Sequence, residues 1–292
     1  MKHLKNHLSF ALSLALLIGT AQAEIKERRA SIPIQVDLQS GEVIKRDMEL
    51  VIFQDSSAEV PRPVIIFGHG YPGNNTNVST WAWLLSHRKA LNDFVKLGFT
   101  VVMPMRIGQG GTGGQTLEHG CNQLAQDYAE RIKNINTQLK QATSWVKQQD
   151  FAKADQILFV GQSAGGSGAM GLSADEQNPF RLIVNFAAGS GKDRSPDFPC
   201  SPEAYGEQLA VYGKQSKMEM LWIYGLNDTF WGKKWPVKWA EAYEGAGGKL
   251  EFHQIDSNTL EGHNLFRQSP EVWLPIVKAY FAKNNLFPAT PN

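Results

Sequence analysis

Short apolar runs alternate with longer amphipathic stretches along most of the chain beyond residue 60. The runs are almost continuously apolar, which is typical of strands that are buried on both faces of a parallel sheet. We therefore expect strands at residues 63–68, 99–105, 156–161, 181–188, 218–225 and 249–255. Apolar spacing and capping residues predict helices at residues 79–97, 123–149, 236–244 and 270–283, and a helix of small residues that begins at Ser163.

The regular alternation of strands and helices predicts a single α/β domain over residues 24–292. Its central sheet should be mostly parallel and covered by helices on both faces. Residues 32–38 and 48–53 are expected to form an N-terminal antiparallel hairpin at one edge of this sheet. Residues 189–216 are polar and contain proline, so we expect a small cap-like insertion there, over the sheet.

Residues 1–23 have the pattern of a secretory signal peptide. Lys2 and Lys5 precede an apolar stretch at 8–18, and the small-x-small sequence "AQA" at 21–23 provides a cleavage site. The apolar stretch is too short for a stable membrane anchor, and no later run is long enough for one. We therefore expect export to a bacterial periplasm or to the extracellular space. The alternative reading of this segment is an N-terminal amphipathic helix.

The composition is that of an ordinary soluble globular protein, with 42% hydrophobic residues, 20% charged residues and a formal net charge of +1. Such a balance does not indicate a nucleic-acid partner. The chain has two cysteines, Cys121 and Cys200. In an oxidising compartment they are expected to form a disulfide, which would tie a glycine-rich loop to the cap. The sequence is silent on oligomeric state.

The segment 156–168 places one serine among small residues at the end of a predicted strand. Gly161-Gln162-Ser163-Ala164-Gly165 fits the pattern G-x-S-x-G. In this pattern the serine occupies a sharp turn between strand and helix, and the flanking glycines leave room for it. The turn raises the hydroxyl above the sheet, at a helix N-terminus that favours developing negative charge. The alternative is a helix N-cap serine with packing glycines.

A serine hydroxyl becomes a strong nucleophile only when a base takes its proton. His263 follows the last predicted strand and is the candidate base, and Asp228 follows the strand at 218–225 and is the candidate acid. Asp256 and Glu261 lie nearer to His263 in sequence and are the alternative acids. His253 lies inside a predicted strand, so its ring is expected to point into a packed face and to be structural.

Acyl transfer also needs hydrogen-bond donors for the oxyanion that forms on the substrate. The stretch "IIFGHGYPGN" ends a predicted strand in a glycine-rich turn. The backbone N–H groups of Tyr71 and Ala164 are the expected donors. His69 and Gly70 are expected to support this loop.

A second glycine-rich stretch, "RIGQGGTGG", has Gly108, Gly110 and Gly113 in the spacing of a dinucleotide-binding fingerprint. That fingerprint requires a helix that opens at once beneath the phosphates. Here a helix is expected only beyond Cys121. We therefore expect a flexible loop beside the active site, with Arg106 near its base.

The motifs "HGYPG", "GQSAG", "GLND" and "EGHN" occur in the order and at the strand ends expected of an α/β-hydrolase. From about residue 32 to 284 the chain resembles that superfamily. It looks most like the serine members related to dienelactone hydrolases and to the catalytic domains of prolyl-oligopeptidase-like enzymes. The resemblance implies Ser163 as nucleophile, Asp228 as acid and His263 as base. It also implies an oxyanion hole from Tyr71 and Ala164, with neither a metal nor an organic cofactor.

Two departures limit this resemblance. Dienelactone hydrolases carry cysteine where this chain has Ser163, so their substrate is not carried over. We also expect no β-propeller before the domain, and hence no size filter of that kind for peptides. We expect a serine esterase that hydrolyses a small-molecule carboxylic ester through an acyl-enzyme. One alternative is a serine aminopeptidase or dipeptidyl peptidase, which would need an acidic anchor for the peptide amine. The other is an inactive hydrolase fold that serves as a binding protein.

Overall fold

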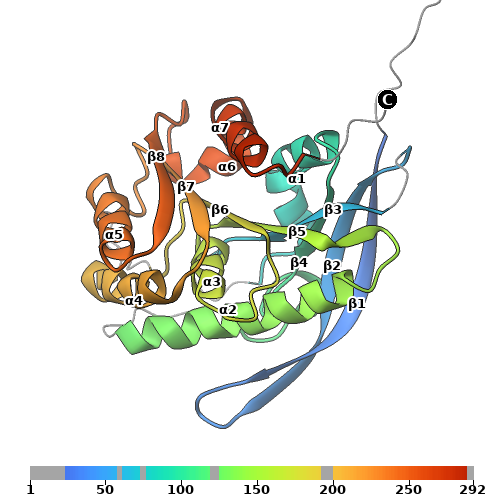
Figure 1. Ribbon diagram of the computed structural model, residues 1–292. Helices are drawn as coiled ribbons and strands as arrows, with labels where there is room; N and C mark the ends of the chain where they lie inside the picture. The colour runs from blue at the N-terminus through green and yellow to red at the C-terminus, as the bar shows by residue number, and fades with distance from the viewer. Residues whose placement is uncertain (1–23, 58–60, 73–76, 119–124, 192–199, 288–292) are drawn as a thin grey trace, which may run out of the picture.

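The computed structural model describes residues 24–57, 61–72, 77–118, 125–191 and 200–287 (Figure 1). An eight-stranded sheet of order β1-β2-β4-β3-β5-β6-β7-β8 forms its centre. The strands are β1 (Ile25–Asp37), β2 (Val43–Asp55), β3 (Arg62–Gly68), β4 (Thr100–Pro104), β5 (Ala152–Gln162), β6 (Leu182–Phe186), β7 (Glu219–Gly225) and β8 (Lys249–Ile255). From β4 to β8 all neighbouring strands are parallel, whereas β2 pairs antiparallel with β1 and with β4.

The sheet confirms the predicted α/β class and the antiparallel hairpin at its edge. Both hairpin strands are longer than predicted, because their register continues from Asp37–Val43 as far as Ile25–Asp55. The outer part of β1 carries charged residues at 26–29, so its apolar alternation is lost although its backbone remains paired. Backbone pairing therefore extends beyond the half-buried part that the hydrophobic pattern reveals.

Helices cover both faces of the sheet (Figure 1). Side chains of the central strands alternate between these faces, so Val64 and Ile66 of β3 pack on one side while Ile65 and Phe67 pack on the other. The first face is covered by α2 (Ala125–Val146), α3 (Ala164–Ser173), α4 (Pro202–Gln215) and α5 (Lys234–Gly245). The second is covered by α1 (Thr80–Lys96), α6 (Leu265–Gln268) and α7 (Pro270–Lys283).

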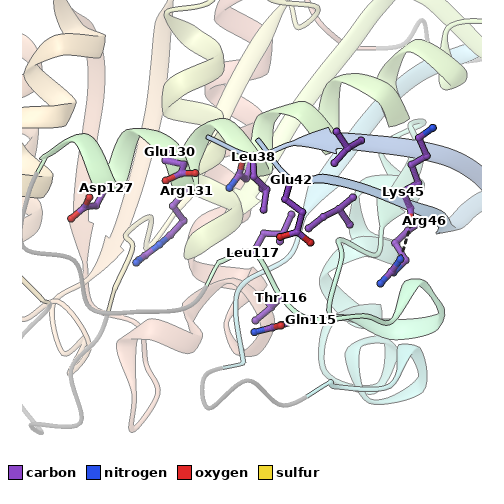
Figure 2. A pocket seen from close by; sticks show the side chains of 13 residues that line it. Leu38, Glu42, Lys45, Arg46, Gln115, Thr116, Leu117, Asp127, Glu130 and Arg131 are labelled. Atoms are coloured by element: carbon purple, nitrogen blue, oxygen red, sulfur yellow. Dashed lines mark hydrogen bonds between the residues drawn. The ribbon is translucent and has the colours of Figure 1, made fainter. Parts of the chain in front are cut away.

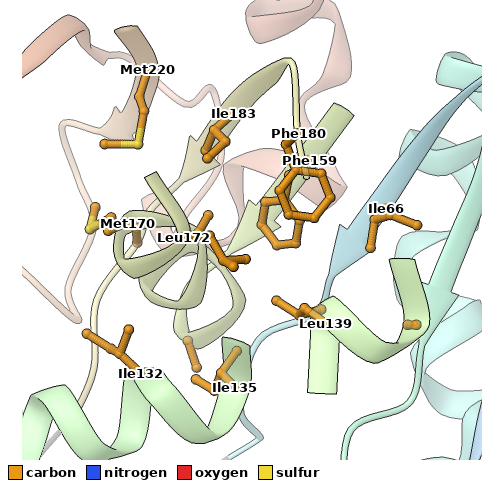
Figure 3. Close-up of a cluster of buried hydrophobic side chains, with 14 of the residues drawn as sticks. Ile66, Ile132, Ile135, Leu139, Phe159, Met170, Leu172, Phe180, Ile183 and Met220 are labelled. Atoms are coloured by element: carbon orange, nitrogen blue, oxygen red, sulfur yellow. The ribbon is translucent and has the colours of Figure 1, made fainter. Parts of the chain in front are cut away.

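Figure 3 shows the core of the first face. Ile135 and Leu139 of α2 and Leu172 of α3 meet Ile66 and Phe159 from the sheet, and all five side chains are almost completely buried. Burying a side chain of this size contributes about 1.5–3 kcal/mol to stability. This packing holds α3, and with it the turn that precedes α3, against the centre of the sheet.

Part of the segment expected to form a cap is a helix of the sheet-covering layer. Helix α4 packs against α2 and α5, and its residues Tyr205 and Leu209 belong to the buried core of the first face. The sequence pattern did not predict this helix, because Pro202 at its first position and the polar residues around it are typical of a loop. A proline is well tolerated at that position, where the backbone N–H has no partner within the helix. Residues 192–199 lie outside the described part.

Three predictions concern residues beyond the described ranges and stay predictions. They are the signal peptide at 1–23, the export without a membrane anchor that it implies, and the Cys121–Cys200 disulfide. Cys121 lies outside the described residues, while Cys200 is buried just before α4. Within the ranges that the structure describes, no helix combines the length and the apolar character needed to cross a bilayer.

Candidate active site

Ser163 lies in the turn between β5 and α3, at the carboxyl end of the central parallel strands. Its backbone is strained, with φ of 54° and ψ of −122°, a conformation that costs a non-glycine residue about 1–3 kcal/mol. The turn is held by the Ser163 N–H, which donates to the Phe186 carbonyl at the end of β6. A strained residue that its surroundings hold this firmly marks a candidate functional position.

The glycines beside Ser163 are required by close backbone approach. A Cβ atom on Gly165 would lie 2.1 Å from the carbonyl oxygen of Gly68 at the end of β3. One on Gly161 would lie 2.7 Å from the backbone nitrogen of Gly166. The G-x-S-x-G spacing thus lets α3 start directly against two strands, and this proximity produces the sharp turn.

A chain of hydrogen bonds joins three side chains that are distant in sequence. The Nε2 atom of His263 lies 3.1 Å from the Ser163 Oγ, and its Nδ1 lies 3.1 Å from an Asp228 carboxylate oxygen. All three residues are at least nine-tenths buried. They follow β5, β7 and β8, so the parallel sheet brings them to the same end. The arrangement can pass a proton from the serine hydroxyl to the imidazole.

The loop after β7 fixes both the acid and the ring. The second oxygen of Asp228 accepts the backbone N–H groups of Phe230 and Trp231, at 2.8 and 3.1 Å. The Phe230 ring stacks on the His263 imidazole, with centroids 4.0 Å apart and planes 9° from parallel. Together these contacts leave the imidazole one orientation between Ser163 and Asp228.

The alternative acids do not contact the imidazole. Glu261 accepts the backbone N–H groups of His263 and Thr229, at 2.9 and 3.0 Å, so it ties together the loops that carry His263 and Asp228. Asp256 accepts the N–H of Asn258 within its own loop.

The interpretation of His253 as a ring in a packed face is wrong. Its side chain is 33% exposed and contacts Glu251, because β8 is the edge strand of the sheet.

Gln162 and His87 form a support behind the imidazole that the sequence pattern did not predict. Gln162 donates through its amide to the His263 carbonyl at 3.2 Å, and its own carbonyl accepts from the Nε2 of His87 at 2.8 Å. The Nδ1 of His87 lies 2.7 Å from the Ser86 hydroxyl, which can donate to it. The same Nδ1 also lies 3.0 Å from the Trp83 carbonyl oxygen, which can only accept a hydrogen bond. A neutral His87 with its hydrogen on Nε2 satisfies the contacts with Gln162 and Ser86 and leaves the Trp83 contact unused. Burial, the largest influence, lowers the pKa of His87 to about 4.

We expect this buried histidine to make the protein sensitive to acid. In the unfolded chain His87 takes up a proton near its ordinary pKa of 6.5, but in the folded protein only near 4. Stability should therefore fall as the pH drops from about 6.5 to 4, by about 3 kcal/mol from His87 alone. Urea unfolding measures the free energy of unfolding across this pH range. Its fall between pH 6.5 and 4 should be about 2–3 kcal/mol smaller for His87→Gln than for the wild type. Replacing the partly exposed His253 with Gln is the control, and an equal flattening there would contradict this assignment.

The predicted oxyanion loop lies directly beside Ser163. Ala164 begins α3, and a Cβ atom on Gly70 would lie 3.4 Å from the Ser163 Cβ. The His69 ring is buried, with its Nδ1 at 2.7 Å from the Gly70 carbonyl and its Nε2 at 3.1 Å from the backbone N–H of Arg106. Burial lowers the pKa of His69 well below its ordinary value, so the ring is neutral. His69 thus contacts the loop that it was expected to support.

A cavity of about 360 Å³ opens onto the Ser163 hydroxyl. Its wall combines apolar groups from the oxyanion loop, α1 and the Asp228 loop with polar groups from α1 and α6. None of its described lining residues is acidic, and its one fixed charge is the guanidinium of Arg267, whose pKa burial lowers. The lining residues are Gly70, Tyr71, Pro72, Val78, Ala82, Trp83, Ser86, His87, Gln162, Ser163, Phe230, His263, Asn264 and Arg267.

A second cavity, of about 660 Å³, lies between the β1–β2 hairpin, α2 and residues 115–117 (Figure 2). Its lining carries acidic and basic side chains in equal number: Glu42, Asp127, Glu130, Lys45, Arg46 and Arg131. It contains none of the three hydrogen-bonded residues of the serine site.

Solved structures share this fold at low sequence identity. The Pyrococcus furiosus esterase Pf2001 superposes with a TM-score of 0.55, at 14% identity over 87% of this chain and 90% of that one. Est1E from Butyrivibrio proteoclasticus, solved with ferulic acid, superposes with a TM-score of 0.57, at 14% identity over 86% of this chain and 99% of that one. The Pyrococcus horikoshii acylaminoacyl peptidase superposes with a TM-score of 0.59, at 14% identity over 95% of this chain but only 44% of that one. No protein-family model and no curated protein sequence matches the chain.

The sheet order, the helical layers and these likenesses define the α/β-hydrolase fold, as the sequence motifs predicted.

Proposed function

We propose that this protein is a serine hydrolase that cleaves carboxylic esters through an acyl-enzyme. The observation that carries the proposal is the hydrogen-bonded series Ser163–His263–Asp228 at the end of the sheet, with the serine in the lining of a cavity. A nucleophile, a base and a group that orients the base are the parts that acyl transfer needs. The likeness to two esterases gives the fold, and the proposal adds the chemistry.

In the proposed reaction, His263 Nε2 takes the proton of Ser163 as the Oγ attacks the ester carbonyl. The N–H groups of Tyr71 and Ala164 stabilise the oxyanion of the tetrahedral intermediate. His263 then gives its proton to the leaving alcohol, which departs and leaves the acyl group on Ser163. A water molecule, deprotonated by His263, attacks this acyl-enzyme, and His263 returns the proton to the Ser163 Oγ as the acid leaves. Asp228 accepts the Nδ1–H of the ring throughout and stabilises its charged form.

The cavity favours an ester over the free amino terminus of a peptide. A peptidase that grips an amino terminus needs an acidic anchor, and the described lining residues include none. They do include Arg267, whose positive charge would repel an ammonium group. The acylaminoacyl peptidase is also more than twice as long as the part that this chain covers, so the likeness leaves most of that enzyme without a counterpart.

Labelling with a fluorophosphonate probe tests the proposal and separates it from an inactive binding protein. We expect one adduct per chain, on the peptide that contains Ser163, because only an activated serine reacts at a useful rate. Hydrolysis of p-nitrophenyl esters should then exceed hydrolysis of aminoacyl p-nitroanilides. Absence of labelling in folded protein would contradict a serine hydrolase, and preferential anilide cleavage would favour the peptidase.

A further inference from the structure

The peptide unit between Gly70 and Tyr71 is held from behind by two buried side chains. Its carbonyl oxygen lies 2.7 Å from His69 Nδ1 and accepts a hydrogen bond from Arg106 Nη2 at 3.2 Å. In a planar trans peptide the N–H points opposite to the C=O. Fixing the Gly70 carbonyl toward Arg106 therefore directs the Tyr71 N–H to the other side, where Gly70 lies against Ser163.

Arg106 is itself held by a buried carboxylate. Its Nε and Nη2 donate to the two oxygens of Glu118, at 2.5 and 2.8 Å, and both side chains are almost completely inaccessible. The remaining nitrogen, Nη1, is buried and has no hydrogen-bond partner among the described residues. A buried pair contributes little net stability, and an unsatisfied buried donor costs about 1–3 kcal/mol. Stability alone therefore does not account for placing this guanidinium here.

The glycine-rich loop after β4 makes the pairing of Arg106 with Glu118 possible. Gly108 has a φ of 91°, and a Cβ atom on it would lie 2.6 Å from the Cα of Thr116. The chain thus folds back on itself so that Glu118 returns to Arg106. The short 3-10 helix Gly110–Thr112 lies within this turn, where a dinucleotide fold would begin a long helix. The glycine spacing that resembles a nucleotide fingerprint is explained by this return of the chain.

We propose that Arg106 is a positioning residue for the oxyanion hole, and that Glu118 holds it in place. By bonding the Gly70 carbonyl, Arg106 aims the Tyr71 N–H at the negative oxygen of the tetrahedral intermediate. The adjacent Pro72 restricts Tyr71 to extended backbone, so the donor keeps this direction. The inference rests on the proposed serine-hydrolase function and assigns a further residue to it.

Arg106→Lys isolates the contact, because lysine keeps the charge beside Glu118 but loses the nitrogen that reaches Gly70. With p-nitrophenyl acetate we expect kcat per labelled active site to fall about 10- to 100-fold, since removing an oxyanion donor outright costs about 10²- to 10³-fold. KM should stay within about two-fold, because the ground-state ester carries no oxyanion. The affinity for a trifluoromethyl ketone, which forms such an oxyanion on Ser163, should fall by a factor similar to kcat.

Gln138→Leu is the matched control. Gln138 is also buried and accepts the backbone N–H of Ile107 at 2.8 Å, so its loss loosens the same loop without touching Gly70. Its kcat should stay within about three-fold of the wild type. An equal loss of kcat in both variants would overturn the proposal, because general loosening would then explain the effect. So would a kcat for Arg106→Lys within two-fold of the wild type.

If Arg106→Lys does not fold, Glu118→Gln replaces it. Glutamine keeps the shape but releases one of the two anchors of the guanidinium, and kcat and the ketone affinity should again fall together. Unchanged values in this variant would overturn the proposal. Absence of fluorophosphonate labelling in the wild-type protein would contradict the hydrolase function itself. If the wild type is labelled but the variants keep its kcat and ketone affinity, only the role of Arg106 is contradicted.

Discussion

Ser163→Ala is expected to lower kcat for p-nitrophenyl esters by about 10⁴- to 10⁶-fold, because the attacking atom is removed. The melting temperature should stay within a few degrees, since within the described ranges the Ser163 hydroxyl has one hydrogen bond, to His263. Initial rates and a thermal melt of the same preparation measure both effects. Full esterase activity in this variant would show that another residue is the nucleophile.

Ser163→Gly provides the control for backbone strain. The variant should be as inactive as Ser163→Ala. Its free energy of unfolding should exceed that of Ser163→Ala by about 1–2 kcal/mol, because glycine adopts a φ of 54° at little cost. Such a result would show that the native serine is kept in its turn at the expense of stability. A glycine variant no more stable than the alanine variant would contradict this reading of the strain.

Gly165→Ala is expected to cause the largest loss of stability among single methyl additions to this turn. The new Cβ would lie 2.1 Å from the Gly68 oxygen and 2.4 Å from the Gly68 carbonyl carbon, and both atoms belong to the backbone of β3. Neither α3 nor the central strand can move without disturbing the core, so we expect a loss of at least about 3 kcal/mol. Urea unfolding followed by circular dichroism measures this loss.

Gly245→Ala is the matched control, at a position where the structure has room for the added methyl group. Apart from its chain neighbours and the backbone of its own helix, no described atom lies within 4 Å of a Cβ at this position, at the end of α5. Alanine should be neutral there or stabilise the helix by up to about 1 kcal/mol. A loss at Gly165 no greater than at Gly245 would contradict the close approach of α3 and β3.

The sequence was sufficient to predict the strands at the centre of the sheet and the serine turn. Strands buried on both faces are apolar throughout, so a strand such as 156–161 can be recognised from its own residues, without knowledge of the strands that pair with it. The steric demand of the turn leaves a local signature around Ser163. His263 and Asp228 could be proposed because parallel strands present their carboxyl ends at one edge.

Features that depend on partners distant in sequence were harder to predict. Helix α4 was missed because its buried face, which includes Tyr205, is recognisable only once α2 and α5 lie beside it. The contact between Gln162 and His87 joins residues 75 positions apart, and no spacing rule relates them. The pairing of Arg106 with Glu118 was hidden for a different reason, since the glycines between them matched a motif of another function.

The edge position of β8 has a consequence for refolding. The imidazole that lies 3.1 Å from the Ser163 hydroxyl belongs to a residue 100 positions later, in the loop beyond this last strand. A chain in which β3, β5 and β6 have already associated therefore has its serine turn but no proton acceptor. Recovery of ester hydrolysis after dilution from urea should follow recovery of the circular dichroism signal, so turnover reports the docking of the final strand.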